Sequence, residues 1–549
     1  MMKQSEYIIS NDANCKYCYK CLRNCPVKAI SFHDEKSFVI EEECVLCGTC
    51  VNVCPQHAKN YRRDLDVFDS IVKKPFVLSV APSVYAYFDN PFKVFDLFKS
   101  LGCVYISETA VGAQFVTDAY LKQLASANGP RITTSCPVIV NIVEKYFPQY
   151  LGYLMPVVSP AIAHSQFLRY KFGDLPRVFI GPCVAKKEEL KEHYNLVLTF
   201  EEIEEWIQKE EINIDDYTEK LPDAPYPERT RMYPVTGGIL YSADKQALEH
   251  VVVEGTENFI EFLEKFEPST HDKTIIEASS CIGGCLNGPA MKKDTNILVR
   301  KNTLINYFKM LSDHAEKRIN TSNYDLNLSK HFVDKNARIQ VPEEQIREVL
   351  HLLGKDDKAK ELNCTGCGYE TCYEKARAVV LGKAEKDMCF AYLVEIVSSV
   401  SYKVVDETPN AIVIFKGERI TYINTAAKAL FEGYTDEKIL EICKKVYSKR
   451  YKIQELYINS RKVYFYPKTF ELPGDGGNVV LFVDITEMVL QRERMDEIKR
   501  KSIQKIEEVL NDQMKLAQDI AGLLGESIAE TKSHFLEFKN YMEDDDANL

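Results

Sequence analysis

The sequence predicts a multidomain protein that combines α+β and α/β domains and ends in a long helix. Three observations support this prediction. The chain has 549 residues, more than a single core usually organises. Clustered cysteines mark two short segments, 15–54 and 364–389. From about residue 401, short strands of alternating polarity take over, and a helical stripe of apolar residues follows them.

Composition and charge exclude some classes of protein. The formal net charge is −12, whereas a general nucleic-acid binder needs a basic face. No apolar run reaches the roughly 18 residues that a membrane span requires, and the start, MMKQSEYIISNDANC, lacks the apolar core of a signal peptide. We therefore expect a cytoplasmic protein that binds neither nucleic acid nor membrane. In that reducing compartment, 18 cysteines favour metal binding over disulfides.

Eight cysteines form a repeated motif near the N-terminus. CKYCYKCLRNCP begins at Cys15 and CVLCGTCVNVCP begins at Cys44, so both copies read C-x2-C-x2-C-x3-C-P. This is the spacing of the bacterial two-cluster ferredoxins, in which the fourth cysteine of each motif binds the other motif's cluster. Zinc knuckles are the alternative, but the doubled spacing favours iron–sulfur. The predicted [4Fe–4S] ligand sets are Cys15, Cys18, Cys21 and Cys54, and Cys44, Cys47, Cys50 and Cys25.

A third set of cysteines lies in CTGCGYETCYEKARAVVLGKAEKDMC, as Cys364, Cys367, Cys372 and Cys389. Small residues around Cys367 allow the backbone to turn tightly, and alanines and charges predict a helix from Cys372 to Cys389. The segment resembles the small [4Fe–4S] domain of corrinoid and electron-transfer proteins. Zinc stays an alternative, because four thiolates also suit that ion.

Six cysteines remain. Cys103 and Cys443 are isolated, and each is expected to be a small buried apolar residue. The other four are spread over about 150 residues of the chain, so any shared site must form where separate loops converge. By themselves these four predict one more cluster. They are Cys136, Cys183, Cys281 and Cys285.

With their neighbours, these four cysteines resemble the three signature loops of the [FeFe]-hydrogenases. TTSCP, GPCVAKKEE and EASSCIGGCLNG occur in the order that the family has them, and VAPSV and VTGG fall where the family has similar strings. The resemblance extends from about Phe76 to Phe308 and implies a two-lobed α/β domain. It also implies an H-cluster, in which a [4Fe–4S] cubane shares a cysteine sulfur with a di-iron unit carrying CO, cyanide and a bridging dithiolate amine.

Residue roles follow from the resemblance by position. Cys136, Cys183 and Cys281 would hold the cubane, and Cys285 would bridge to the di-iron unit. Lys186 would donate a hydrogen bond to one cyanide. Without the flanking GPC, the sequence would indicate a surface lysine instead. Pro82 and Ser83 would lie near the other cyanide, and Glu189 would be a structural partner. Close backbone approach to the cofactor is expected at Gly237, Gly238, Gly283 and Gly284.

The chain departs from the family at the residues that move protons. Catalytic members carry a cysteine before the first ligand, and this chain has Ser135 there. A thiol has a pKa of about 8.5 and an alcohol is a far weaker acid, so proton transfer should be slower. Asp118 is the candidate for the next acid, whereas apolar Leu121 occupies the place of a second one. Ser279 stands where a methionine usually packs.

The C-terminal part predicts a sensor domain followed by a helix. NAIVIFKGERITYINTAAKALF, ending later in VDITE, resembles a PAS domain, and a short helix from Pro342 to Gly354 precedes the third cysteine set. From Glu487 to Met542 apolar residues recur at helical steps, which predicts a coiled-coil dimer or a helix folded back on its own chain. The expected domains are 1–65, 74–340, 341–400, 401–487 and 488–549.

These features together predict a slow, H2-sensing [FeFe]-hydrogenase that interconverts H2 with protons and electrons. Three [4Fe–4S] clusters and an H-cluster would relay its redox state to the PAS domain. The expected partners are a redox protein such as ferredoxin, a separate signalling protein, maturation proteins and a second copy that pairs through the PAS domain and the terminal helix. The alternatives are an ordinary ferredoxin-linked hydrogenase and a non-enzymatic hydrogenase-like iron–sulfur protein.

Overall fold

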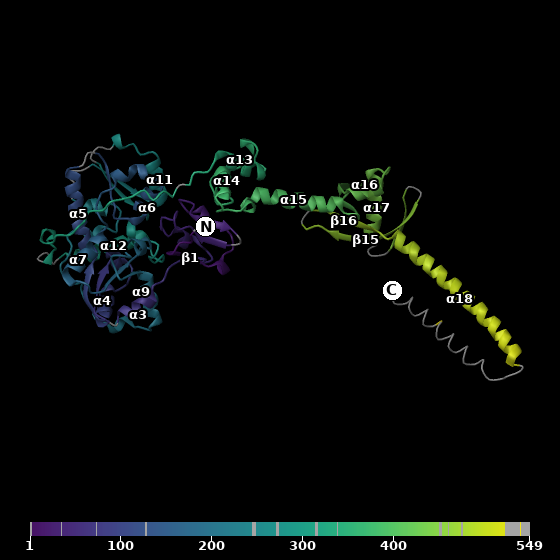
Figure 1. The fold of residues 1–549 in the computed structure, drawn as a ribbon, viewed down its shortest axis with the longest axis horizontal. Helices are drawn as coiled ribbons and strands as arrows, with labels where there is room; N and C mark the ends of the chain where they lie inside the picture. The colour runs from purple at the N-terminus through teal and green to yellow at the C-terminus, as the bar shows by residue number, and fades with distance from the viewer. Residues whose placement is uncertain are drawn as a thin grey trace. The chain divides into compact units, whose positions relative to one another are not determined.

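The protein, described here from a computed structural model, forms two compact units, Met1–Leu393 and Val394–Leu549 (Figure 1). Both units mix helices and strands, which confirms the mixed α/β character that the sequence predicts. No helix within the described part of the chain is long and apolar enough to cross a membrane. The structure describes residue 539 and residues 3–521 without 34–35, 73, 127–128, 244–248, 271–273, 313–316, 338, 449–452, 459–460 and 474–475.

The repeated cysteine motif folds as two matching halves. Each motif contains a loop with left-handed residues, Tyr17 and Tyr19 in the first and Leu46 and Gly48 in the second. Each loop leads into one short helix, so the internal sequence repeat is also a structural repeat. The elements are α1 (Lys20–Arg23), α2 (Thr49–Val53) and two antiparallel pairs, β1 (Ile8–Ser10) with β4 (Lys59–Tyr61) and β2 (Ile30–His33) with β3 (Lys36–Val39).

A parallel four-stranded sheet organises the next segment. Its order is β6 (Cys103–Glu108), β5 (Phe76–Val80), β8 (Arg177–Gly181) and β9 (Leu196–Thr199). Alternate side chains of β5, β8 and β9 enter different cores, as the period of two requires. One face packs on α3 (Leu65–Ile71), α4 (Pro91–Ser100), α9 (Phe200–Lys209) and α12 (Ile297–Leu311), and the other packs on α5 (Ala110–Ala125) and α7 (Pro160–Phe172).

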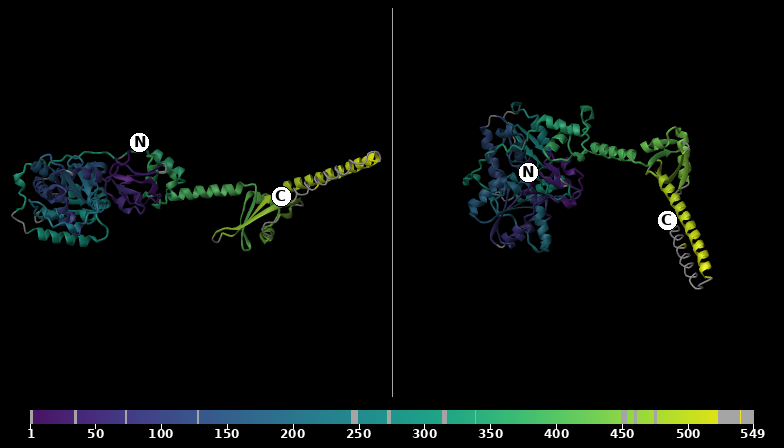
Figure 2. Two further views of the ribbon diagram at one scale, coloured as in Figure 1. Left: turned by 90° about the horizontal axis from the view of Figure 1, so that it is seen from below. Right: turned by 45° about the vertical axis from the view of Figure 1, so that its right-hand side comes forward.

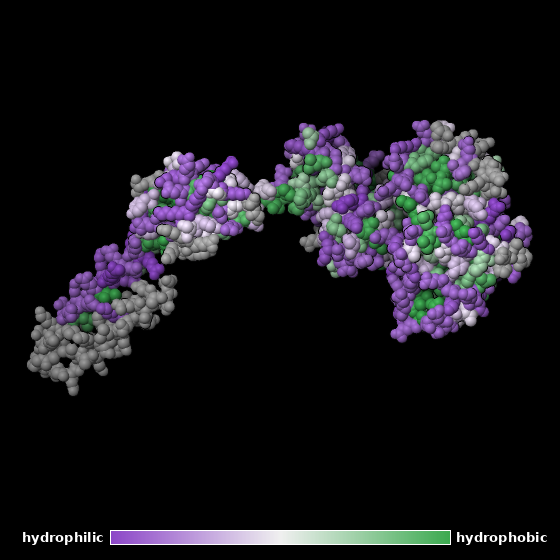
Figure 3. Space-filling model, turned by 180° about the vertical axis from the view of Figure 1, so that it is seen from behind, coloured by the Kyte–Doolittle hydropathy of each residue, from purple (hydrophilic) through white to green (hydrophobic). Residues whose placement is uncertain are grey.

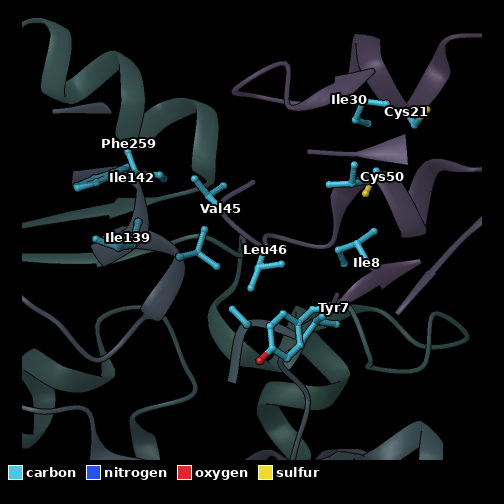
Figure 4. Close-up of a cluster of buried hydrophobic side chains, with 14 of the residues drawn as sticks. Tyr7, Ile8, Cys21, Ile30, Val45, Leu46, Cys50, Ile139, Ile142 and Phe259 are labelled. Carbon is cyan, nitrogen blue, oxygen red and sulfur yellow. The ribbon is translucent and has the colours of Figure 1, made fainter. Parts of the chain in front are cut away.

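A second, smaller parallel sheet forms the other lobe of this segment. Its order is β10 (His250–Glu254), β11 (Ile275–Ser279) and β7 (Arg131–Ile132). Helices α6 (Pro137–Tyr146) and α11 (Thr256–Glu264) pack on it. Their buried side chains join those of the N-terminal hairpins in one cluster, which Figure 4 shows with Ile139, Ile142 and Phe259 near Val45. The N-terminal halves and this lobe therefore share a hydrophobic core.

We expect His164 on α7 to make the free energy of unfolding depend on pH. Its ring nitrogens Nδ1 and Nε2 lie 2.7 and 3.0 Å from the hydroxyls of Ser79 and Ser107. Burial lowers the pKa of His164 from 6.5 to about 3, so the folded protein keeps the ring neutral. The unfolded chain takes up a proton below about pH 6.5, and the free energy of unfolding should fall by about 2 kcal/mol from pH 7 to pH 5 because of this residue.

Denaturant unfolding followed by the fluorescence of Trp206, the single tryptophan, measures this effect. His164→Asn should lose that share of the pH dependence, because an amide does not titrate. His351→Asn is the control, since that side chain is 82% exposed, and it should keep the wild-type pH dependence. The same slope in wild type and His164→Asn would contradict the prediction.

The third cysteine set lies between three helices. The predicted helix near Pro342 is confirmed as α13 (Glu343–Leu352). The predicted helix from Cys372 to Cys389 is wrong in its second half, because α14 (Cys372–Val380) ends before Gly382, whose φ is +69°. The chain then turns through residues 386–388 and continues as α15 (Phe390–Glu407).

The second unit contains a five-stranded antiparallel sheet in the order β13-β12-β16-β15-β14. The short strands that the sequence predicts after residue 401 are present, and α16 (Thr425–Leu430) and α17 (Asp436–Ser448) pack on the sheet in a cluster that contains Ala427, Phe431 and Cys443. Cys443 is thus buried, as predicted. The strands are β12 (Ala411–Lys416), β13 (Arg419–Ile423), β14 (Gln454–Ile458), β15 (Arg461–Glu471) and β16 (Asn478–Asp484).

A long helix, α18 (Thr486–Ala521), leaves this sheet, as Figure 2 shows in two further views. It confirms the predicted C-terminal helix over its first part. The later members of the predicted stripe lie outside the described residues, so both alternatives for the tail stay predictions. Those members are Leu524, Ile528, Phe535, Phe538 and Met542.

Candidate functional site

The three signature loops converge because each follows the carboxyl end of a parallel strand. Cys183 follows β8, Cys281 follows β11, and Cys136 follows β7 and caps α6. Pro82 and Ser83 follow β5, the central neighbour of β8. Carboxyl ends of parallel strands meet at one edge of a sheet, and crevices form there. The two sheets thus present their loops to one space.

That space is a cavity of about 120 Å³. The thiols of Cys136, Cys183 and Cys285 line it, and Cys281 is close enough for its thiol to interact electrostatically with all three. Cys285 is exposed and lines this cavity. Other lining residues from the predicted site are Pro82, Ser83, Ser135, Lys186, Ser279 and Gly284.

The thiols are poorly suited to stay ionised without a metal. Burial, with a smaller contribution from neighbouring thiols, raises the pKa of Cys183 to about 11 and that of Cys285 to about 12. Burial and the other three cysteines also place the pKa of Cys281 well above 9. A bound cationic cluster would reverse this preference, because thiolates are the ligand form. The donor set therefore fits an iron–sulfur group.

Lys186 lies on the cavity wall, in the short helix α8 (Ala185–Glu189). Its side chain is only 12% exposed, which contradicts the surface-lysine alternative. Its Nζ donates to Glu189 Oε2 at 2.5 Å and to the Ser135 carbonyl at 3.3 Å, and Ser159 also donates to that carboxylate. Burial opposes the charge, but Glu189 outweighs it, so the pKa of Lys186 is raised and the ammonium stays charged.

Two further observations fit an anionic occupant of the cavity. Ser83 lines the cavity, and its hydroxyl is fully buried and has no hydrogen-bond partner in the structure. A buried hydroxyl without a partner is costly, and an acceptor in the cavity would satisfy it. Gly284 lines the same wall with φ +75°, and a Cβ there would lie 2.3 Å from the Pro234 carbonyl oxygen. Only glycine fits at that position.

The other predicted glycines do not line the cavity. The amide of Gly237 donates to Glu277, and that of Gly283 donates to Glu254. Gly238 faces the Met232 carbonyl, to which a Cβ would come within 1.8 Å. These three glycines position the loops around the site. Of the four predicted glycines, Gly284 is the one whose backbone lies at the cavity.

The neighbour of Ser135 is a residue that the sequence reasoning missed. Tyr120 OH lies 3.4 Å from Ser135 Oγ and 3.1 Å from Thr134 Oγ1, and it accepts from the Thr134 amide at 2.8 Å. Asp118, two residues earlier on α5, does not line the cavity; Thr321 and Gln114 donate to its carboxylate. Residues two apart point to different sides of a helix, so Asp118 and Tyr120 face different surroundings, and no local sequence signal indicates which of them contacts Ser135.

Several N-terminal thiols lie near thiols of the other motif, and the two ligand sets stay a prediction. The thiol of Cys21 interacts with those of Cys15 and Cys54, and the thiol of Cys44 interacts with those of Cys47 and Cys25. Backbone amides of Ala29 and Ala58 donate to the sulfurs of Cys25 and Cys54 at 3.3 and 3.2 Å. Cys47 and Cys281 line one further cavity, so this group adjoins the signature loops.

The third set also converges. Cys364, Cys367, Cys372 and Cys389 line one small cavity of about 20 Å³. This domain packs on the N-terminal halves: Phe32 donates its amide to the Lys383 carbonyl at 2.8 Å, and Gly368 contacts Leu22. Tyr369 has both Cys367 and Cys25 as electrostatic neighbours. Among the residues that the structure describes, no three His, Cys, Asp or Glu side chains converge on a single metal ion.

Comparisons with known families match three parts of the chain. Residues 74–289 match the family model described as the iron only hydrogenase large subunit, C-terminal domain. Residues 7–62 match the 4Fe-4S dicluster domain, and residues 361–390 match a model described as an Fe-S cluster.

Two curated relatives are similar to parts of the chain. Iron hydrogenase 1 of Clostridium pasteurianum is 22% identical over 381 residues, which cover 48% of this chain and 66% of that protein. One component of an ion-translocating oxidoreductase complex of Methanosarcina acetivorans is 37% identical over 51 residues, 9% of this chain and 19% of that protein. The chain thus spans less than two thirds of either relative.

Solved structures of [FeFe]-hydrogenases also align with the chain. The apo enzyme of Chlamydomonas reinhardtii, in a variant form, is 17% identical, with a TM-score of 0.37, and covers 49% of this chain and 96% of its own. A structure from a study of oxygen inactivation is 16% identical, with a TM-score of 0.39, and covers 50% and 99%. From the family matches, the chain carries an [FeFe]-hydrogenase H-cluster domain and a 4Fe–4S ferredoxin domain, and it is a hydrogenase-like iron–sulfur protein related to the [FeFe]-hydrogenases at low identity.

Proposed function

We propose that this protein is an H2-sensing [FeFe]-hydrogenase of low turnover. The observation that carries the proposal is the cavity wall: the four thiols and Lys186 gather as a hydrogenase cofactor needs, while Ser135 stands where catalytic members have a relay cysteine. Compared with catalytic members, the chain keeps the cysteines at the ligand positions but has a weaker acid at the proton-relay position. A site that reacts with H2 but turns over slowly suits detection better than fuel metabolism.

The residues around the cavity would hold an H-cluster through Cys136, Cys183, Cys281 and Cys285. When bound, that cofactor supplies heterolytic cleavage of H2. Lys186 would donate to an anionic ligand of the group, held in place by Glu189, and Ser83 would donate its free hydroxyl. The apolar walls, with Phe179 and Ile239 among them, exclude water and strengthen these contacts.

Proton movement would depend on hydroxyl groups. Ser135 Oγ is the polar group at the cavity that contacts Tyr120 OH, 3.4 Å away. Burial raises the pKa of Tyr120, so the phenol keeps its own proton and can pass one on only while accepting another. A pair of weak acids relays protons less readily than a thiol and a carboxylate, which supports a slow site.

Electrons would leave through neighbouring clusters. Cys281 adjoins Cys47, and Tyr369 interacts electrostatically with both Cys25 and Cys367, which supports a path from the cavity through the N-terminal cysteines to the third set. Helix α15 begins directly after Cys389 and leads to the five-stranded sheet, whose antiparallel order supports the PAS assignment. We infer that reduction of the third cluster biases the packing of this sheet and of α18, a two-state change that a separate signalling protein reads.

Infrared spectroscopy and hydrogen exchange test the proposal. Protein expressed with its maturation proteins should show CO and cyanide bands that shift under H2. Amide exchange in α18 and the sheet should change between the H2-reduced and the oxidised protein. Bands without any change in exchange would favour an ordinary ferredoxin-linked enzyme in the cytoplasm, and a lack of bands would favour a non-enzymatic iron–sulfur protein.

Ser135→Cys is expected to raise H2 turnover by roughly 10- to 100-fold, because a thiol restores an acid of suitable pKa beside the cofactor. The measurement is H2 oxidation by the maturated protein with an artificial dye as electron acceptor. Ser135→Ala is the matched control and should lower turnover below wild type. Equal rates for the serine, alanine and cysteine forms would show that protons take another route.

A further inference from the structure

The helix α15 (Phe390–Glu407) carries a row of exposed apolar side chains. None of its side chains is buried, and the exposed fractions reach 70% for Phe390, 55% for Val397 and 66% for Val404. Figure 3 shows hydrophobic side chains on the surface of this segment. Scattered apolar residues are ordinary on a surface, but a continuous row of them marks an interaction site.

The row has the period of a coiled coil. Phe390, Leu393, Val397, Val400 and Val404 follow one another at steps of three, four, three and four, the a and d positions of a heptad repeat. Phe390, Val397 and Val404 occupy the a positions, and Leu393 and Val400 the d positions. Val397 and Val404 at a, with Leu393 at one d position, match the pattern that favours two parallel strands. The row therefore fits a second helix of the same period.

We propose that α15 pairs in parallel with α15 of a second copy of this chain. The residues beside the row are uncharged for most of its length, with Val394 and Ile396 on its flanks and Glu395 on the opposite side. The row offers no charged side chains that a partner of opposite charge could recognise. An identical helix, in contrast, presents the same apolar row at the same spacing. A membrane surface is a poorer occupant, because such helices carry a face rich in Lys and Arg and α15 has Lys403 alone.

Each end of α15 contacts the residues of its own unit, and a parallel pair brings the same unit of two copies together at each end. At the first turn, Leu393 donates its amide to the Cys389 carbonyl, and Ala391 and Tyr392 pack beside that thiol. At the last turn, Asn424 of the sheet domain donates to the Val405 carbonyl, and Thr425 and Tyr422 donate to Asp406. Parallel pairing brings like domains together at each end. The inference goes beyond the proposed function, because pairing requires no reaction with H2.

Sedimentation of the full-length protein over a range of concentrations tests the pairing. We expect a dimer, about twice the chain mass of 62.9 kDa. Val397→Asp combined with Val400→Asp should raise the dimer dissociation constant by at least about tenfold, because each charge would be buried against its own copy. Ser398→Asp is the matched control, since it places the same charge one residue off the row, and it should leave the constant unchanged.

Photocrosslinking keeps the test independent of how well the double variant folds. Val400→p-benzoylphenylalanine should yield a covalent dimer joined through α15, and the same group at Ser398 should yield far less. A monomer at every concentration, a dimer that the aspartates do not weaken, a crosslink within one chain to its C-terminal residues, or flotation with phosphatidylglycerol vesicles would each overturn the pairing. None of these outcomes depends on infrared bands or on the response to H2, so they leave the proposed function to its own test.

Discussion

Cys285→Ala is expected to abolish the CO and cyanide infrared bands of maturated protein and to lower H2 turnover by at least roughly 10³-fold, equivalent to about 4 kcal/mol of barrier. The resemblance gives this thiolate the role of joining the two halves of the cofactor. The structure places Cys285 on the cavity wall beside Cys136 and Cys183, with Cys281 nearby. Without its sulfur the di-iron half would have no protein ligand. The three remaining thiols would still hold a cubane.

Cys103→Ala is the matched control for this prediction. Cys103 lies in the same unit and is buried; its thiol donates to the Tyr105 carbonyl at 3.3 Å, and it belongs to no predicted ligand set. It should keep the bands and the turnover. Visible absorption of the N-terminal clusters should be unchanged in both variants, which separates a lost cofactor from a misfolded chain. If the CO and cyanide bands persist in Cys285→Ala, the predicted role of Cys285 as the bridging ligand is wrong.

Arg231→Met is expected to lower the free energy of unfolding of the first unit by about 3–5 kcal/mol. The Arg231 guanidinium and the Glu108 carboxylate are 1% and 2% exposed. Arg231 Nε donates to Glu108 Oε1 at 2.7 Å and Nη2 donates to Oε2 at 2.6 Å, while the Tyr85 hydroxyl donates to the same carboxylate. Removal of the cation leaves a buried carboxylate charge without its partner. The destabilisation comes from that uncompensated buried charge. It is larger than the net contribution of the intact ion pair to the free energy of unfolding.

A double variant tests this reason directly. Arg231→Met with Glu108→Leu removes both charges and should recover a large part of the lost stability. Glu261→Gln breaks the exposed pair with Lys265 and should cost less than about 0.5 kcal/mol. Denaturant unfolding followed by Trp206 fluorescence measures all three variants. A double variant as unstable as Arg231→Met alone would show that packing, and not buried charge, sets the cost.

Arg231 also has a consequence for the site. It lies directly before Met232 and Tyr233, and Tyr233 lines the cavity. Glu108 ends β6, next to the strand that presents Pro82 and Ser83. The buried pair therefore ties the loop over the cavity to the edge of the sheet, and loss of stability should be accompanied by weaker retention of the cofactor.

Several features were predictable because they depend on residues close together in the chain. The repeated C-x2-C-x2-C-x3-C-P spacing predicts thiols that turn toward a common point, and the left-handed residues Tyr17 and Leu46 recur at the same place in both copies. Alternating polarity predicts the strands between Ala411 and Asp484. The helix predicted from Cys372 to Cys389 failed because Gly382, favourable for a left-handed turn, ends it early.

Other features were not predictable from local pattern. Whether Asp118 or Tyr120 faces Ser135 depends on the rotation of α5 against the sheet, which Gly112 sets by its close contact with Pro160 on α7. Likewise, Gly237 and Gly283 carry the same sequence signal as Gly284, but Glu277 and Glu254 already bind their amides. Such choices depend on side chains contributed from distant segments.

The sequence by itself determined the ligand chemistry of this protein: which thiols exist, how the N-terminal ones are spaced, and that a serine stands beside Cys136. The tertiary structure decided which groups share a cavity, because four remote loops meet only when two parallel sheets align their carboxyl ends. It also decided that Lys186 is buried and charged against Glu189, that the Ser83 hydroxyl is left without a partner, and that Tyr120 contacts Ser135. Burial and distance arise from packing of the whole unit, and no short stretch of sequence contains them.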